Sequence, residues 1–217
     1  MLSDKNSRVI RAFGILNTNI PKSLPLYGIP FPGQYLIDPD GVVRDKQFLD
    51  DYRERPTASE VLLRDFGVAG GLKTIIRADE VEAAVQLSAN RAFAGQELGV
   101  VVDFSVKPPW HVYGQPLPRN YTTTSVHFDT AGILRQSLTF PRPQLVKIAS
   151  LGEVLPVYTG NFRAAGTMVV TGKLKPGNRQ LSGELCFQEC NDEICKLPRT
   201  VKFTMPITIE PPATANR

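Results

Sequence analysis

The chain has 217 residues, enough for one large domain or two small ones, and its 42% hydrophobic content is ordinary for a soluble globular protein. The 25 basic and 21 acidic residues leave a net charge of +4 without any long run of like charges, so a mixed solvated surface is favoured over a nucleic-acid-binding one. No apolar stretch reaches the length of about 18 residues that a membrane-spanning helix needs, so no membrane insertion is expected. The first six residues lack an apolar core and a small-residue cleavage site, and we expect no signal peptide there.

The first elements in chain order are a helix, a loop and a hairpin. Residues 1–13 are predicted to contain the end of a helix, because apolar residues recur there at helical spacing. A proline-rich loop follows over 20–32. Residues 34–38 and 42–49 are predicted to be two strands, because the Pro-Asp-Gly sequence at 39–41 favours a tight turn between them.

A second helix is expected after the hairpin. Thr57–Glu60 has the pattern of a capping box, in which the Thr and Glu side chains satisfy unpaired backbone N–H groups. The helix is predicted to run through Phe66 and to end at Gly67. Gly70 and its neighbouring glycine form a plausible hinge, so the domain boundary is expected within 68–78.

From there the apolar residues alternate with period two, which is typical of strands that bury one face. Residues 81–88, 100–107 and 201–209 show this alternation most clearly. Because Gly, Pro and Asn turns separate such segments, residues 78–210 are predicted to form a mainly β domain, an antiparallel β-sandwich. Pro206 has no N–H to donate, which predicts that the last strand lies at a sheet edge.

The three cysteines, Cys186, Cys190 and Cys195, lie within ten residues of one another. Cys190 and Cys195 flank a turn rich in Asn and Asp between two predicted strands, and a hairpin there brings their Cα atoms within the roughly 4.4–6.8 Å that a disulfide needs. Cys186 precedes Cys190 by four residues of the same strand, too far along the chain to bond to it. We therefore predict a Cys190–Cys195 disulfide and a free Cys186.

Two alternatives to redox chemistry remain open at this point. A metal site is disfavoured, because a fourth ligand would have to be His111 or His127, neither of which is near in sequence. A structural disulfide is as plausible as an exchanging one, since so short a loop contributes only about 2 kcal/mol of stability. In that alternative the sandwich is a non-catalytic binding or structural domain.

Two motifs bear on that choice. Residues 110–118 read Trp-His-Val-Tyr-Gly-Gln-Pro-Leu-Pro, and residues 188–198 contain Gln-x-Cys-x4-Cys-x-x-Pro. Together they resemble the N-terminal domain of the thiol:disulfide interchange protein DsbD and its relatives. The resemblance implies an immunoglobulin-like sandwich, a periplasmic or extracytoplasmic location, and a cysteine pair that exchanges electrons with thioredoxin-like partners. It implies no cofactor and no metal, and it favours exchange over a structural disulfide.

The same resemblance suggests roles for individual residues. Cys195 matches the cysteine that forms mixed disulfides with partners, Cys190 matches its resolving mate, and Tyr113 matches an aromatic beside the pair. The family shields the pair with a loop that bears a Phe, and Leu151 is the nearest candidate in the corresponding stretch here. Trp110, Tyr113 and Leu151 are the predicted partner-binding residues.

Local charge predicts how reactive the reduced pair is. Glu189, Asp192 and Glu193 are expected to crowd the hairpin and to disfavour a thiolate by like-charge repulsion. Lys196 is expected to offset only part of this effect. The reduced form should therefore be inert until a partner docks.

Residues 27–41 and 50–57 resemble the C-terminal half of a peroxiredoxin-type redoxin, in which Pro32 matches the cis-proline of thioredoxin folds. No Cys precedes Cys186, so this partial α/β segment is expected to perform no thiol chemistry. The chain is expected to begin partway through a two-domain protein. Four segments are therefore predicted, namely a partial thioredoxin-like domain, a linker, the DsbD-like sandwich and a disordered tail, at residues 1–67, 68–77, 78–210 and 211–217.

Overall fold

The computed structural model describes residues 4–48, 61–63, 66, 71–148 and 151–211. The chain separates into two compact units, Met1–Pro56 and Thr57–Arg217, and each is considered by itself. Within the described residues, no helix has the length and apolar character required to cross a membrane. The predicted capping box, the end of its helix at Gly67, the hinge glycine at 70 and nearly all of the predicted tail lie outside the described residues.

The first unit contains the predicted hairpin. A short 3-10 helix, η1 (Lys5–Ser7), leads into α1 (Arg8–Ala12), and β1 (Gly33–Ile37) pairs antiparallel with β2 (Val43–Phe48). Asp38 fixes the turn, because its Oδ1 accepts hydrogen bonds from the N–H groups of Asp40 and Val42 at 3.0 and 2.8 Å. Gly41 adopts a φ of +80°, which a glycine tolerates without steric cost.

One part of the redoxin resemblance is wrong. The cis X-Pro peptide bonds among the described residues precede Pro109 and Pro116, and the bond before Pro32 is not one of them. Pro32 therefore does not correspond to the cis-proline of thioredoxin folds.

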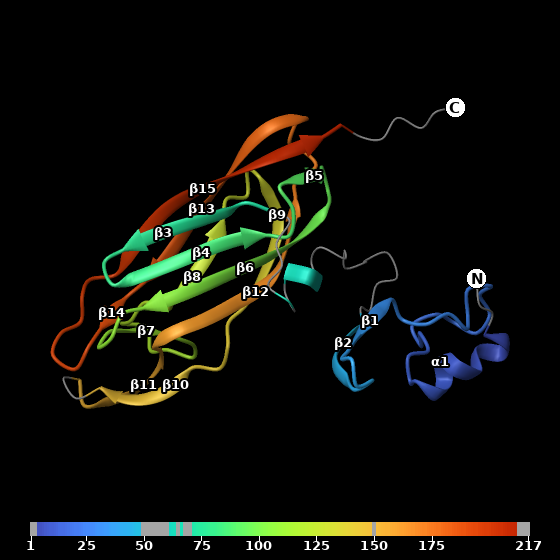
Figure 1. The fold of residues 1–217 in the computed structure, drawn as a ribbon, viewed down its shortest axis with the longest axis horizontal. Helices are drawn as coiled ribbons and strands as arrows, with labels where there is room; N and C mark the ends of the chain where they lie inside the picture. The colour runs from blue at the N-terminus through green and yellow to red at the C-terminus, as the bar shows by residue number, and fades with distance from the viewer. Residues whose placement is uncertain (1–3, 49–60, 64–65, 67–70, 149–150, 212–217) are drawn as a thin grey trace. The chain divides into compact units, whose positions relative to one another are not determined.

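The second unit is built from three sheets (Figure 1). The first sheet has the order β3-β4-β6-β12-β9, with bounds Lys73–Ala78, Val81–Leu87, Glu97–Val106, Gly160–Val170 and Ile133–Thr139. The second has the order β5-β15-β13-β8, with bounds Arg91–Phe93, Arg199–Glu210, Gly177–Phe187 and Ser125–Phe128. The third has the order β10-β11-β7-β14, with bounds Gln144–Ile148, Glu153–Tyr158, His111–Tyr113 and Glu189–Cys190.

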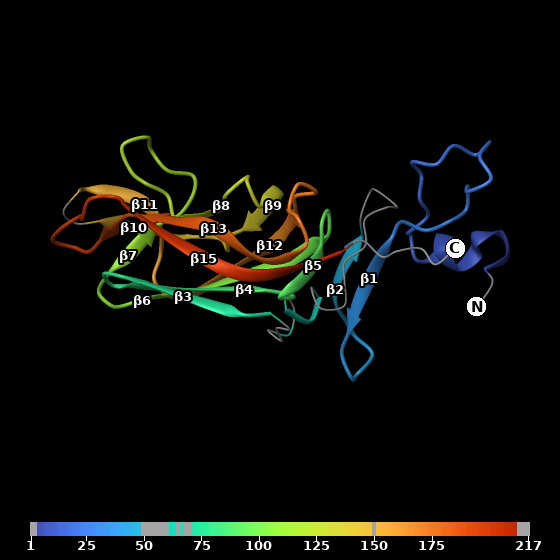
Figure 2. The same ribbon diagram turned by 90° about the horizontal axis from the view of Figure 1, so that it is seen from above.

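The first two sheets form the predicted sandwich, and Figure 2 shows them as two layers. Alternate residues of β13 are buried, and the buried members contact apolar side chains of β4, β6 and β12 in one continuous core. The largest of these core side chains include Leu87, Leu98, Met168, Leu181 and Phe187. The period-two pattern thus identified the core-facing side of β4, β6 and β15, as expected for a mainly β sandwich.

The predicted edge position of the last strand is wrong for the strand as a whole. β15 is second in its sheet, because it pairs with β13 along its length and with β5 at its end. The pairing with β5 covers only Thr208–Glu210. Pro206 precedes that segment, so its missing N–H interrupts no hydrogen bond to β5.

The chain changes sheet just before the cysteine pair. β13 ends at Phe187 in the second sheet, and β14 begins two residues later in the third sheet, where it pairs with β7. Since β7 also pairs with β11, this small sheet joins the cysteine loop to the β10–β11 hairpin.

Candidate redox site

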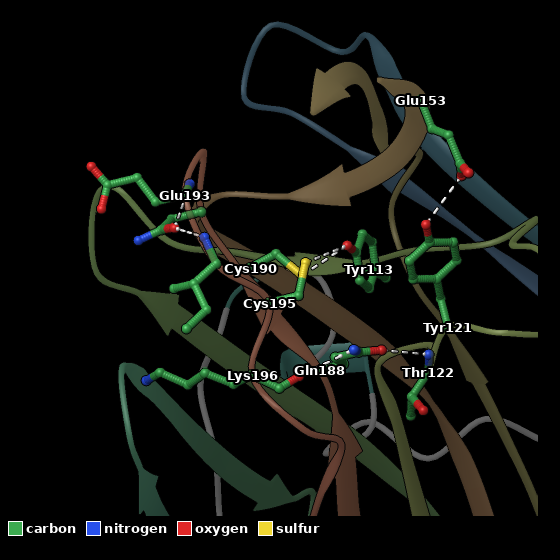
Figure 3. Close-up of a disulfide and its surroundings, with 11 residues drawn as sticks. Tyr113, Tyr121, Thr122, Glu153, Gln188, Cys190, Glu193, Cys195 and Lys196 are labelled. Atoms are coloured by element: carbon green, nitrogen blue, oxygen red, sulfur yellow. Dashed lines mark hydrogen bonds between the residues drawn. A yellow bond between two sulfur atoms is a disulfide. The ribbon is translucent and has the colours of Figure 1, made fainter. Parts of the chain in front are cut away.

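Cys190 and Cys195 form a disulfide with their Cα atoms 4.1 Å apart, and Cys186 is free, as predicted (Figure 3). The turn between them is closed by Asn191, whose Oδ1 accepts hydrogen bonds from the N–H groups of Glu193 and Ile194 at 2.9 and 2.8 Å. Asn and Asp favour such turns because their side chains bond to backbone two or three residues ahead. The turn chemistry in the sequence therefore positions the disulfide.

The two cysteines differ in exposure. Cys190 is 0% exposed, whereas Cys195 is partly exposed. Of the two residues, only Cys195 has surface that another protein can contact. This asymmetry agrees with the roles that the family resemblance implies for the two cysteines.

Tyr113 lies directly against the disulfide. Its hydroxyl is 2.8 Å from the Sγ of Cys190 and 3.5 Å from the Sγ of Cys195. Burial, with smaller contributions from Tyr121 and Glu153, raises the pKa of Tyr113 to about 12. The hydroxyl therefore keeps its proton at neutral pH, and it is the donor because disulfide sulfurs carry no hydrogen.

An apolar cluster surrounds this contact. Its buried members all come from the third sheet, and they are Tyr113, Ile148, Leu155, Val157 and Cys190. Leu151, in the turn between β10 and β11, packs against the cluster together with Tyr121 and Cys195. Tyr121 in turn donates a hydrogen bond from its hydroxyl to the carboxylate of Glu153 at 3.1 Å. The β10–β11 hairpin thus contributes a side chain at the position where the family resemblance placed a shielding residue.

The three acidic residues near the disulfide do not all crowd it, contrary to the expectation from the sequence. Glu189 does not crowd the disulfide with free negative charge, because its side chain is 1% exposed and accepts a hydrogen bond from Lys196 Nζ at 2.8 Å. It also accepts one from the N–H of Glu80 at 3.2 Å. Asp192 and Glu193 remain exposed. Only these two of the three acids can repel a nearby thiolate at the surface.

Trp110 is half-buried against the main core, and the Nζ of Lys196 lies 4.1 Å from its ring centroid. Its indole therefore serves the packing of the sandwich and a cation–π contact. Tyr113 is fully buried, so it is not part of the exposed surface. Of the three predicted partner-binding residues, Tyr113 belongs to the cluster that contains Cys190, Leu151 packs against that cluster, and Trp110 packs against the main core instead.

Gln188 links the cysteine loop to a neighbouring segment. Its Nε2 donates to the carbonyl of Lys196 at 3.1 Å, and its Oε1 accepts from the N–H of Thr122 at 3.0 Å. Gln188 is the first residue of the Gln-x-Cys-x4-Cys-x-x-Pro motif, but the sequence alone indicated no role for it. A buried Gln whose amide nitrogen and oxygen both bond to backbone fixes the loop to the neighbouring segment.

The two histidines lie on different strands. Among the described residues, no group of three His, Cys, Asp or Glu side chains is placed to hold a metal ion. His127 lies on β8 with its Nδ1 3.1 Å from the amide nitrogen of Gln136. His111 is buried on β7 and pairs with Cys190 of β14, a position that the sequence analysis did not predict.

Comparison with known proteins shows which family contains this domain. Residues 80–207 match the family described as thiol:disulfide interchange protein DsbD, N-terminal. The chain belongs to this family. The matched region of the DsbD-type domain contains the disulfide, Tyr113 and the β10–β11 hairpin. It begins after the segment that resembles a redoxin, which therefore stays a prediction. No curated protein matches the chain.

Solved structures show remote similarity to the DsbD-type domain. The N-terminal periplasmic domain of ScsB from Proteus mirabilis is 14% identical, with a TM-score of 0.45 over 68% of this chain and 53% of that one. The N-terminal domain of Neisseria meningitidis DsbD in the reduced form is 16% identical, with a TM-score of 0.36 over 54% and 80% of the two chains. A family 123 glycoside hydrolase from Clostridium perfringens is 13% identical, with a TM-score of 0.30 over 61% and 28%. The chain thus spans about half of the ScsB domain, at 53%.

Proposed function

We propose that residues 78–210 form an exchange module that passes electrons through the Cys190–Cys195 disulfide to or from thioredoxin-like partners, in the periplasm or another extracytoplasmic compartment. The observation that carries this proposal is the unequal environment of the two sulfurs. Cys195 is accessible, whereas Cys190 is enclosed and lies 2.8 Å from a protonated hydroxyl. A disulfide that served stability alone would need neither a partly exposed cysteine nor a hydrogen-bond donor at the other sulfur.

The exchange begins when a partner's thiolate attacks the Sγ of Cys195. The Cys190–Cys195 bond breaks, a mixed disulfide forms at Cys195, and Cys190 leaves as a thiolate. Tyr113 stabilises this leaving group, because its hydroxyl donates a hydrogen bond to the developing negative charge. A second thiolate of the partner then attacks the partner's own sulfur in the mixed disulfide. That step releases Cys195, so two electrons have passed to the module.

Electrons leave by the reverse sequence. The thiolate of Cys195 attacks a disulfide of the acceptor and expels one of its sulfurs as a thiolate. Cys190 then attacks the Sγ of Cys195, which restores the module's disulfide and expels the acceptor's second sulfur. Cys190 is therefore the resolving cysteine in the direction that delivers electrons.

The partner contacts an apolar surface next to Cys195. Ile194 and Leu197 flank this cysteine in the chain, and their side chains are 56% and 83% exposed. Leu151 lies beside the same pair on the hairpin. Since Tyr113 is buried and Trp110 packs on the core, we assign docking to Ile194, Leu197 and Leu151. Tyr113 does not contact the partner, and its role is the hydrogen bond to Cys190.

Trapping experiments test the roles of the two cysteines. A thioredoxin-like partner that lacks its resolving cysteine is loaded with thionitrobenzoate on the remaining one. It is then mixed with reduced Cys190→Ala or Cys195→Ala, each in a Cys186→Ser background. Cys190→Ala should accumulate a mixed disulfide with the partner, and Cys195→Ala should accumulate little. Equal trapping by both variants would show that the assigned roles are wrong.

The competing function is a structural disulfide in a non-catalytic sandwich, which the complete burial of Cys190 favours. The reduction potential separates the two functions, since structural disulfides lie below about −300 mV and exchange modules lie higher. A potential below that value, together with no trapping by any thioredoxin-like partner, would establish the structural role.

A further inference from the structure

His111 is a buried titratable residue that has no part in the exchange steps above. It lies on β7 directly opposite Cys190 of β14 in antiparallel register, and both side chains are buried. Residues in such a pair point to the same face of the sheet, with Cβ atoms about 4.5–5.5 Å apart. The imidazole therefore lies next to the side chain of the resolving cysteine.

The Nε2 atom of His111 is buried and has no hydrogen-bond partner among the described residues. A buried polar atom without a partner destabilises the fold, so its presence calls for a physical explanation. In the disulfide form, Cys190 has no hydrogen to offer. Reduction gives Cys190 an S–H group and frees its side chain to rotate, so the residue paired with His111 then carries a hydrogen-bond donor.

The charged surroundings suit a neutral imidazole that takes up a proton only briefly. Burial lowers the pKa of His111 from its ordinary value, so the ring is neutral at pH 7. Asp192, from the cysteine loop, acts in the opposite direction and favours the protonated ring. The other titratable groups nearby are Tyr113, which keeps its proton, and the Glu189–Lys196 pair, whose members bind each other.

We propose that His111 accepts the proton of the Cys190 thiol when the module delivers electrons. The inference rests on the exchange function proposed above. In the mixed disulfide at Cys195, the S–H of Cys190 gives its proton to Nε2 of His111, and the resulting thiolate attacks the Sγ of Cys195. The Cys190–Cys195 bond forms, the acceptor leaves as a thiolate, and the proton on His111 passes to that thiolate or to water. The cysteine pair loses two electrons and the acceptor gains them.

The test uses dithiobis(nitrobenzoate) as the acceptor, so it requires no protein partner. In reduced protein with Cys186→Ser, the first thionitrobenzoate released reports the attack by Cys195, and the second reports resolution by Cys190. His111→Gln and His111→Phe should slow the second phase by at least about 10-fold at pH 7. The first phase should be unchanged. The deficit should shrink as the pH rises and the thiol ionises without help.

His127→Gln is the matched control, because His127 is the other histidine of the chain and should leave both phases unchanged. If His111→Phe fails to fold, His111→Gln carries the test, since its amide keeps the polar character of the site without a titrating nitrogen. A second phase at the wild-type rate in His111→Gln would overturn the proposal. So would a deficit of equal size at every pH, because that result indicates a structural effect. Failure to exchange with thioredoxin-like partners would leave this reaction unaffected, so it would count against the exchange function alone.

Discussion

At the residue scale, the hydroxyl of Tyr113 is the group that distinguishes Cys190 from an ordinary buried cysteine. Tyr113→Phe removes a donor 2.8 Å from its Sγ, and a hydrogen bond to a charged group is worth about 1.5–3 kcal/mol. We expect reduction of the disulfide by dithiothreitol to slow by about 10-fold, because Cys190 becomes a poorer leaving group. Tyr121→Phe is the control, since its hydroxyl bonds to Glu153 and not to sulfur. Equal rates in the two variants would contradict the role of Tyr113.

Lys196 neutralises a buried carboxylate. Lys196→Met leaves Glu189 without its cation, and removing one partner of a buried pair costs several kcal/mol. Because Lys196 is 30% exposed and solvent screens the pair, we expect a smaller loss, about 2 kcal/mol in the free energy of unfolding. Urea denaturation measures it. Lys202→Met, which breaks an exposed pair with Glu184, should cost less than about 0.5 kcal/mol, and a comparable loss in both variants would refute the argument.

The buried His111 makes the free energy of unfolding depend on pH. Its pKa in the folded protein is lower than the ordinary value of 6.5, because burial disfavours the charged ring. The unfolded chain therefore binds more protons below that pH, and the contribution of His111 to stability is lost as pH falls through the folded pKa. We expect oxidised wild-type protein to lose more free energy of unfolding than His111→Gln between about pH 7 and pH 5. Parallel pH profiles of the two proteins would contradict this.

At the scale of elements, the β10–β11 hairpin packs Leu151 against the cluster around the cysteine pair, and we propose that it covers the pair. Leu151→Ala removes a side chain that packs against the cluster around Cys190, so small reductants should reach the disulfide more often. We expect reduction by dithiothreitol to be several-fold faster. Leu145→Ala on the same hairpin is the control, because its side chain is 73% exposed. A faster reaction in both variants would indicate general loosening of the hairpin.

At the scale of the whole molecule, the two compact units differ in what they can do. Residues 57–217 contain all three cysteines and the complete sandwich, so this fragment should melt cooperatively and show the proposed exchange activity. Residues 1–67 contain no cysteine and, among the described residues, only one two-stranded sheet, which is marginal by itself. That fragment should show no peroxidase or reductase activity and no cooperative melt by circular dichroism. A cooperative melt would show that the first segment is an independent domain.

The sequence by itself determined the features that depend on local chemistry. Alternation with period two identified the long strands β4, β6 and β15, because one face of each packs on the sandwich core, although β4 and β6 also bury residues of the opposite face. The Asn-Asp turn determined which cysteines pair, since it brings Cys190 and Cys195 together and leaves Cys186 on β13. Both features depend only on residues that are close together in the sequence.

Tertiary structure alone decided which groups surround the disulfide. β7 and β14 are three and two residues long, too short for any periodicity to predict that His111 lies opposite Cys190. Burial of Glu189 against Lys196 likewise depends on contacts with Glu80, 109 residues away in the chain. A charge read from sequence is assumed to be solvated, and only the fold reveals which charges are buried and paired.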